Sequence, residues 1–173
     1  MEYKFRNLKA TEIDCRVSQI NEKGLSLLLY KDARVDMDIL DETVGPMNWK
    51  RTHTRDNANC VIEIWDEDKK QWIGKEDTGT ESFTEKEKGL ASDSFKRAGF
   101  NWGIGRELYT APFIYIPILD VKNEANFVLE DKNGKKTTKT KFYVEAIEIT
   151  NKEITGLAIK NNKGKRVFVY KKG

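Results

Sequence analysis

The sequence predicts an α+β fold, and three features of the 173-residue chain lead to this prediction. Residues 47–83 contain three strand-like runs joined by short polar turns, which indicates an antiparallel meander. Residues 84–105 carry the longest helical pattern of the chain. Residues 141–172 contain three further alternating runs, which indicates a second meander near the C-terminal end. The length suffices for one domain with a hydrophobic core.

The first segment with a periodic pattern is TEIDCRVSQINEKG, residues 11–24. Ile13, Val17 and Ile20 recur there at helical spacing. Gly24 is a candidate helix end, because glycine readily adopts the backbone conformation that closes a helix. The pattern predicts a short helix over this segment.

A strand and a second helix are expected next. The run GLSLLLYKD, residues 24–32, is densely apolar, as is typical of a strand. The run ARVDMDILDETVG, residues 33–45, is helical in pattern and is ended by Gly45-Pro46, since proline cannot continue a helix. The strands expected in the meander that follows are residues 48–54, 60–67 and 71–83.

The helix predicted over residues 84–105 has a single apolar stripe. Thr84 followed by Glu87 fits a capping box at its start. The stripe consists of four residues spaced by four, three and four positions: Ala91, Phe95, Ala98 and Trp102. Lys96 and Arg97 lie off this stripe. The glycines near the helix end are expected to weaken its last turns or to let another backbone approach closely: Gly99, Gly103 and Gly105.

The last third of the chain is expected to be β-rich. Residues 111–119 are apolar but contain Pro112 and Pro117, which favours an edge strand. Residues 122–141 are polar and carry Asn133-Gly134, a turn signal that predicts a hairpin. The strands of the C-terminal meander are residues 141–150, 153–161 and 165–172.

Composition indicates a soluble globular protein, with 38% hydrophobic and 34% charged residues. The first ten residues lack the apolar segment of a secretion signal, and no apolar run approaches the roughly 18 residues of a membrane helix. Cys15 and Cys60, with His53, do not have metal-ligand spacing, and free thiols are their simplest interpretation. We therefore expect a cytoplasmic protein without a membrane partner.

The net charge of +3 is unevenly distributed. Residues 1–112 contain 18 Lys and Arg against 21 Asp and Glu, whereas residues 113–173 contain 13 against 7. No acidic residue follows Glu153. This asymmetry is compatible with nucleic-acid binding. Lysines that protect a strand edge from aggregation are the alternative explanation.

Few residues support catalysis. His53 is the only histidine, and a catalytic triad needs such a base beside a nucleophile. The segment GIGREL, residues 103–108, lacks the third glycine of a dinucleotide loop and follows a helix instead of opening one. Acidic pairs such as Asp36 and Asp38 suit hard cations but stand in an ordinary helix. The sequence also lacks a Walker-type phosphate loop. We expect no catalytic residue, no cofactor and no metal site.

Cations and aromatic residues together point to single-stranded nucleic acid, because proteins that bind it pair a basic groove with stacking aromatics. The chain offers Arg16, Tyr30, Lys31, Arg34, Trp49, Lys50, Arg51, Lys96, Arg97 and Arg106. Simpler explanations stay open for these residues. Asp93 could pair with Lys96 and Arg97 on the helix surface, and Tyr30, Trp49 and Trp102 could pack in the core.

Three stretches of the chain resemble the N-terminal domain of the Rad-fifty-two family of single-strand annealing proteins. VGPMNW, residues 44–49, is similar to the family's short Gly…Trp motif after the first long helix. GKEDTGTES, residues 74–82, is similar to its strand ending in Glu-Asp-x-Gly. SDSFKRAGFNWGIG, residues 92–105, is similar to its helix with Asp-x-x-Lys-Arg-Ala and a following aromatic-Gly pair. The order and spacings agree from Asp14 to Tyr109, and the last 60 residues have no counterpart.

This resemblance implies a fold and a function. Family members fold as an antiparallel β-meander packed against a long helix, a β-β-β-α core like that of double-stranded-RNA-binding domains. They form homo-oligomeric rings, bind single-stranded DNA in a basic groove, and anneal complementary strands without ATP in homologous recombination and DNA repair. The chain is expected to be a phage or bacterial member. By this resemblance, residues 1–120 form the annealing core, and residues 121–173 form a basic β-rich extension of the same domain that carries the additional C-terminal meander.

The resemblance also assigns DNA-binding residues. Lys96 and Arg97 match the two helix cations that line the family's inner DNA groove. Tyr30 matches the groove tyrosine, and Arg16 matches the groove arginine across a loop that is four residues longer here.

One departure from the family pattern removes a phosphate contact. A further arginine of the family, one turn beyond the Lys-Arg pair, corresponds to Phe100 here, which leaves Arg106 as a candidate substitute. The expected partners are single-stranded DNA and further copies of the chain, with a recombinase or a single-strand-binding protein as another candidate. Three other functions stay open: a single-stranded DNA-binding or recombinase-loading module without annealing activity, a metal-dependent nuclease, and a structural oligomer without a DNA role.

Overall fold

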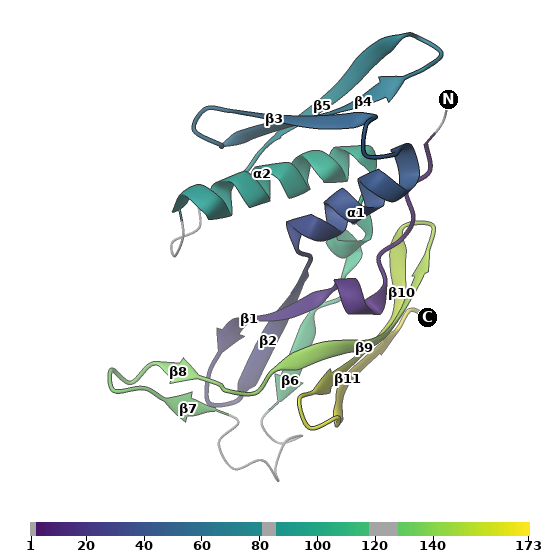
Figure 1. The fold of residues 1–173 in the computed structure, drawn as a ribbon. Helices are drawn as coiled ribbons and strands as arrows, with labels where there is room; N and C mark the ends of the chain where they lie inside the picture. The colour runs from purple at the N-terminus through teal and green to yellow at the C-terminus, as the bar shows by residue number, and fades with distance from the viewer. Residues whose placement is uncertain (1–2, 81–85, 118–127) are drawn as a thin grey trace. The chain divides into compact units, whose positions relative to one another are not determined.

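The computed structural model describes residues 3–80, 86–117 and 128–173, and the chain divides into two compact units (Figure 1). Unit one comprises Met1–Asn7 and Asp32–Arg106, and unit two comprises Leu8–Lys31 and Glu107–Gly173. The described residues form antiparallel sheets and two α-helices, so the predicted α+β class is confirmed. The boundary predicted at residue 120 lies outside the described residues.

Unit one contains the antiparallel meander that the sequence predicts over residues 47–83. Its strands pair in chain order and are β3 (Trp49–Thr54), β4 (Asn59–Asp66) and β5 (Gln71–Thr78). Along β4, buried residues alternate with half-buried ones, because successive residues of a strand point to opposite faces of the sheet. Cys60, Ile62 and Ile64 form the buried face.

The two helices of unit one are α1 (Ala33–Val44) and α2 (Lys86–Trp102), close to their predicted positions. Asp32 caps α1 by accepting a hydrogen bond from the backbone N–H of Arg34 at 2.8 Å. Gly45 ends α1 with a φ of 86°. Figure 1 shows α2 lying along one face of the meander. Neither helix of the described residues is long and apolar enough to cross a membrane, and the capping box predicted at Thr84 lies outside those residues.

The apolar stripe predicted on α2 fixes the helix to the meander. Phe95 and Ala98 are fully buried, and the Phe95 ring packs against Trp49 with 6.1 Å between ring centroids. At the end of the stripe, Trp102 donates its Nε1–H to the Ile62 carbonyl of β4 at 3.0 Å. Burying a side chain such as Phe95 contributes about 1.5–3 kcal/mol to the stability of the fold. The stripe therefore faces the meander, and the opposite side of α2 faces away from it.

The glycines at the end of α2 build a Schellman motif. Gly103 donates its N–H to the Phe100 carbonyl at 3.0 Å, and Ile104 donates its N–H to the Gly99 carbonyl at 3.0 Å. Gly103 has a φ of 93°, a backbone conformation that glycine adopts without steric strain. Because Ile104 is fully buried, the chain leaves the helix along one fixed path.

Unit two is built on a six-stranded antiparallel sheet with the strand order β11-β10-β9-β1-β2-β6. The strands are β1 (Asp14–Ile20), β2 (Gly24–Tyr30), β6 (Ile114–Pro117), β9 (Phe142–Thr150), β10 (Glu153–Asn161) and β11 (Arg166–Lys171). The C-terminal meander is thus confirmed as β9–β11, and β6 lies at the sheet edge, as Pro112 before it and Pro117 within it predict. The remaining described elements are η1 (Ala10–Glu12), η2 (Arg106–Thr110), and the hairpin of β7 (Leu129–Glu130) and β8 (Lys136–Thr137).

The helix predicted over residues 11–24 is wrong, because the middle of this segment, Asp14–Ile20, is strand β1, paired with β2. A register shift lies between Val17 and Gln19. Such an irregularity, as in a β-bulge, moves the alternation of side chains by one residue. Val17 is paired with Leu27 and Ile20 with Leu25, so the shift brings Ile20 to the same face as Val17 although the two are three residues apart. The sequence therefore shows a helical spacing where the chain is extended.

Candidate nucleic-acid interface

Lys96 and Arg97 lie on the side of α2 that faces away from its buried stripe. Both are half-buried, whereas Phe95 before them and Ala98 after them are fully buried. Successive helix residues are about 100° apart, so two residues between two buried ones project from the opposite side. The burial of the stripe therefore orients this pair of cations.

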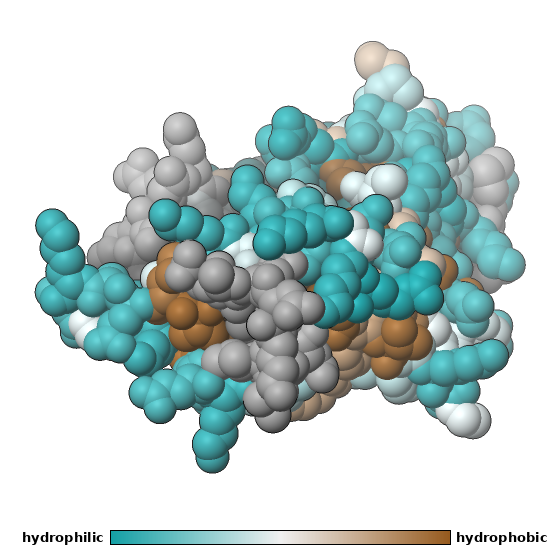
Figure 2. Space-filling model, turned by 90° about the horizontal axis from the view of Figure 1, so that it is seen from below, coloured by the Kyte–Doolittle hydropathy of each residue, from teal (hydrophilic) through white to brown (hydrophobic). Residues whose placement is uncertain are grey.

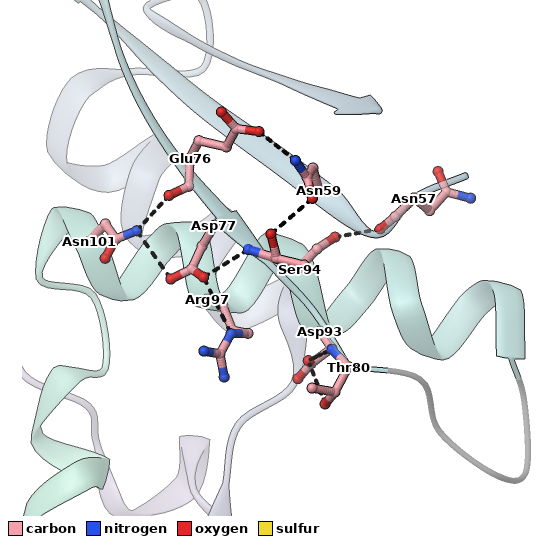
Figure 3. Close-up of polar contacts among 10 residues, drawn as sticks. Asn57, Asn59, Glu76, Asp77, Thr80, Asp93, Ser94, Arg97 and Asn101 are labelled. Carbon is pink, nitrogen blue, oxygen red and sulfur yellow. Dashed lines mark hydrogen bonds and ion pairs between the residues drawn. The ribbon is translucent and has the colours of Figure 1, made fainter. Parts of the chain in front are cut away.

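Arg97 is held by a carboxylate of β5. Its Nε lies 3.5 Å from Oδ1 of Asp77, and the Arg97 side chain remains 39% exposed. Asp77 is itself fixed, because the Thr78 N–H donates to its Oδ1 at 2.7 Å and the Asn101 Nδ2 donates to its Oδ2 at 3.2 Å. Figure 3 shows the terminal nitrogens of Arg97 beyond this contact, pointing away from the strands. The ion pair thus fixes the inner end of the guanidinium group and directs its outer end away from the meander.

Asp93, the alternative partner considered for both cations, has a different role. Its Oδ2 accepts the backbone N–H of Thr80 at 2.8 Å, which ties the end of the meander to α2 (Figure 3). The carboxylate beside Arg97 is that of Asp77. The ammonium group of Lys96 makes no hydrogen bond or ion pair with the part of the chain that the structure describes. Pairing on the helix surface therefore does not explain the presence of Lys96.

Lys96 interacts electrostatically with Asp32 at the start of α1. Hydrogen bonds from the side chain and backbone of Arg34 lower the pKa of Asp32, and the positive charge of Lys96 lowers it further. The Arg34 side chain is 83% exposed, with its Nε 3.0 Å from Oδ1 of Asp32. Arg34 is thus a further exposed cation near Lys96. The sequence offers Arg34 as one of several candidate cations but does not place it near Lys96, because only folding brings α1 beside α2.

Arg106 is bound to the end of α2. Its Nε and Nη2 donate to the Phe100 carbonyl at 3.0 and 2.8 Å, and Nη2 also reaches the Asn101 carbonyl at 3.3 Å. These carbonyls belong to the last turn of α2, which carries the negative end of the helix dipole. The exposed Arg106 side chain therefore has a structural role in addition to the DNA contact predicted for it.

Arg16 and Tyr30 lie on the same face of the sheet of unit two. Arg16 on β1 is paired with Leu28 of β2, and Tyr30 is two residues further along β2. Directly paired residues share a face, as do residues two apart in a strand. Both side chains are exposed, with Tyr30 at 40%. The structure thus brings the predicted arginine and tyrosine together, and Tyr30 is not a core residue.

Three other candidate residues from the sequence are buried or make contacts within unit one: Lys31, Trp49 and Trp102. Lys31 is 1% exposed. Trp49 packs on Phe95 and donates its Nε1–H to Oδ1 of Asp41 at 2.6 Å. Trp102 lies in the stripe of α2. Both tryptophans are half-buried and make contacts within unit one, as the packing explanation expects.

His53 has a hydroxyl neighbour, Ser94. The Ser94 Oγ lies 3.4 Å from His53 Nδ1. Ser94 is fully buried, and its hydroxyl donates to the Asn57 carbonyl at 2.8 Å. Partial burial and then the charge of Arg51 lower the pKa of His53. Among the residues that the structure describes, no group of three or more His, Cys, Asp and Glu side chains could hold a metal ion.

Comparison of the chain with protein-family models, with curated proteins and with solved structures finds no match. The assignment of a function therefore depends on the geometry of Lys96, Arg97, Arg16 and Tyr30 and on the three resembling sequence stretches.

Proposed function

We propose that the protein binds single-stranded DNA and anneals complementary strands without nucleotide hydrolysis, as a homo-oligomeric ring. One observation carries this proposal: Lys96 and Arg97 are adjacent, only partly buried, and turned away from the stripe that fixes α2 to the meander. A fixed helix that presents two cations to solvent is suited to a polyanion, whose phosphates it meets without rearrangement.

The order of elements in unit one supports the resemblance. Three antiparallel strands precede α2, and the helix packs on the last two of them. We propose that these elements are the double-stranded-RNA-binding-domain-like core of the annealing family, with α2 as its long helix. Two further features support this assignment. Helix α1 precedes the VGPMNW stretch, and glycines end α2, as the resemblance implies.

The chemistry of annealing fits such a site. Annealing needs a grip on the sugar-phosphate backbone that leaves the bases exposed for pairing. Lys96 and Arg97 would contact phosphates, and contacts of this kind carry no sequence information. Arg16 and Tyr30 would add a second cation site and a stacking ring, and Arg106 would add a phosphate contact next to its structural role. An oligomer multiplies such weak contacts along one strand through effective concentration.

The test removes both helix cations in the full chain, as Lys96→Ala with Arg97→Ala. The matched control is Lys69→Ala with Lys70→Ala, which removes two adjacent exposed lysines from the turn between β4 and β5. Binding of a labelled single-stranded oligonucleotide is measured over a range of salt concentrations, and thermal unfolding verifies that each variant is folded. We expect the first variant to lose single-strand binding and the control to bind as the wild type does.

The salt dependence sharpens this test. Each phosphate contact on a single strand contributes about 0.7 to the slope of log K against log salt, so two lost contacts lower the slope by about 1.4. A folded Lys96–Arg97 variant with wild-type affinity and slope would refute the site. Light scattering on the same sample should give a mass several times the 20.0 kDa of the chain. A monomer at micromolar concentration would refute the ring.

The same sample distinguishes the other candidate functions. Complementary labelled oligonucleotides should pair faster with the protein than without it. Strand binding without faster pairing would indicate a recombinase-loading or general binding module. Magnesium-dependent loss of the labelled DNA would indicate a nuclease, and indifference to DNA would indicate a structural oligomer.

A further inference from the structure

The register of the six-stranded sheet aligns one residue from each of five strands in a continuous row. Asp14 of β1 is paired with Tyr30 of β2 on one side and with Tyr143 of β9 on the other. Tyr143 is paired with Lys160 of β10, and Lys160 with Arg166 of β11. Directly paired residues share a face, so all five side chains project from the same side of the sheet. At about 4.8 Å per strand spacing, the row is about 19 Å long.

This side of the sheet is open to solvent, and the other side is core. Tyr30 is 40% exposed and Tyr143 is 45% exposed, whereas Phe142 and Ile159, one position along the strands from Tyr143 and Lys160, are buried. Hydrophobic side chains reach the surface among hydrophilic ones in the view of Figure 2. We call the open side of the sheet, with the row and the neighbouring Arg16, the outer face.

The outer face combines two tyrosine rings with cations. Arg16, Lys160 and Arg166 are the positive groups, and Asp14 and Glu145 are the negative ones. Arg166 is engaged by Glu145, with Nε 2.6 Å from its Oε2. The cations beside the two rings are therefore Arg16 at the β1 end and Lys160 at the β10 end, with Asp14 between the rings.

A hollow lies beside the row, further along β10 from Lys160, and is lined by residues of β9, β10 and β11. It has a volume of about 220 Å³, and small side chains line it, including Ala146, Gly156 and Ala158. Arg166 and Lys171 are among its other lining residues. Its lining also includes the acidic Glu148 and apolar residues such as Leu157 and Val169. The feature that suits a single strand is the row itself, because proteins that bind single strands combine stacking aromatics with cations.

We infer that the outer face is a binding platform for single-stranded DNA in which strand β9 and strand β10 extend the Arg16–Tyr30 site. Tyr30 and Tyr143 stack with bases, and Arg16 and Lys160 hold phosphates on either side of the two rings. Asp14 faces the edges of the stacked bases, where its carboxylate accepts hydrogen bonds from amino groups. This gives the C-terminal meander a role in the proposed function, on which the inference rests.

The experiment measures the affinity of the full chain for a fluorescein-labelled oligothymidylate by anisotropy. Loss of one base-stacking ring weakens binding by roughly tenfold, so Tyr143→Ala should show a loss of that size. Tyr143→Phe keeps the ring and should bind as the wild type does. Lys160→Ala should weaken binding and lower the salt slope by about 0.7, as expected for one phosphate contact.

Two controls make the same chemical changes away from the outer face. Tyr109→Ala removes an exposed tyrosine of η2, and Lys132→Ala removes an exposed lysine between β7 and β8. Both should bind as the wild type does. If Tyr143→Ala unfolds, Lys160→Ala with its control carries the test alone, and thermal unfolding of Lys160→Ala verifies that shortening this half-buried lysine leaves the fold intact.

The outcomes separate this inference from the proposed function. Wild-type affinity in Tyr143→Ala and Lys160→Ala, together with loss of binding in the Lys96–Arg97 variant, would overturn the inference and leave the function standing. Absence of binding by the wild type would overturn both. Equal affinity for a duplex of the same length would also overturn the platform, because paired bases are not available to stack on tyrosines.

Discussion

The Nε atom of Arg97 lies 3.5 Å from Oδ1 of Asp77, so the arginine of the proposed DNA site is already in contact with a carboxylate of its own unit. Both side chains are partly exposed, at 39% for Arg97 and 30% for Asp77. An exposed pair of this kind contributes about 0–1 kcal/mol to stability. A phosphate can therefore compete with Asp77 for the outer end of the guanidinium group.

Replacing this carboxylate should strengthen DNA binding. Asp77→Asn removes a negative charge that repels phosphates, and we expect the affinity for single-stranded oligonucleotide to rise by about twofold to fivefold. The matched control is Glu63→Gln, which removes a carboxylate paired with Lys50 from the meander. Equal binding by Asp77→Asn and the wild type would show that Arg97 does not meet the DNA.

Truncation of two adjacent residues of α2 should change the stability of the protein by very different amounts. Phe95 is fully buried, so Phe95→Ala is expected to lower the free energy of unfolding by about 3–5 kcal/mol. Lys96 is half-buried and on the other side of the helix, so Lys96→Ala should change it by about 0.5 kcal/mol or less. Urea denaturation of both variants measures the difference. A large destabilisation by Lys96→Ala would mean that the lysine serves packing rather than DNA binding.

Gly99 should not tolerate a methyl group, although alanine is the better helix former. A Cβ atom at Gly99 would lie 2.5 Å from Oδ1 of Asp36, a fully buried side chain of α1. We expect Gly99→Ala to lower the free energy of unfolding by about 1–3 kcal/mol, as overpacking does, instead of raising it by about 1 kcal/mol. A double-mutant cycle with Asp36→Ala supplies the control. The two changes should couple by about 0.5 kcal/mol or more, and strict additivity would contradict the contact.

The two thiols should be unreactive in the folded protein. Burial, with a smaller effect of Asp14, raises the pKa of Cys15 to about 12, and burial raises the pKa of Cys60 to about 11. The reactive form is the thiolate, so little of it exists at pH 8. Because both pKa values exceed those of the unfolded chain, this contribution to stability is intact below about pH 8.5 and is lost as the pH rises toward 11–12. A thiol reagent at pH 8 should label both cysteines only after denaturation.

A control for the thiol measurement also tests the strand register. Cys15 is paired with Leu29, and the neighbouring Arg16 projects from the opposite side of the sheet. Arg16→Cys should therefore react rapidly in the folded protein while Cys15 does not. Rapid labelling of Cys15 would contradict the position of β1.

Much of unit one could be predicted from the sequence. The stripe Ala91, Phe95, Ala98 and Trp102, with glycines after it, predicts where α2 packs and where it ends, because a period of 3.6 residues and a left-handed end are local properties of the chain. The same pattern places Lys96 and Arg97 on the other side of the helix. The three strands of the meander follow from alternation and short turns in the same way.

The tertiary structure alone decided the partners of these residues. Asp77 rather than Asp93 contacts Arg97, and a register shift after Val17 turns an apparent helix into strand β1. Likewise, alternation marks Tyr143 as a strand residue, but only the pairing of β9 with β1 aligns it with Asp14 and Tyr30. Local pattern depends on neighbours within a few positions, whereas the pairing of distant strands depends on the packing of the whole sheet, which no short stretch of sequence contains.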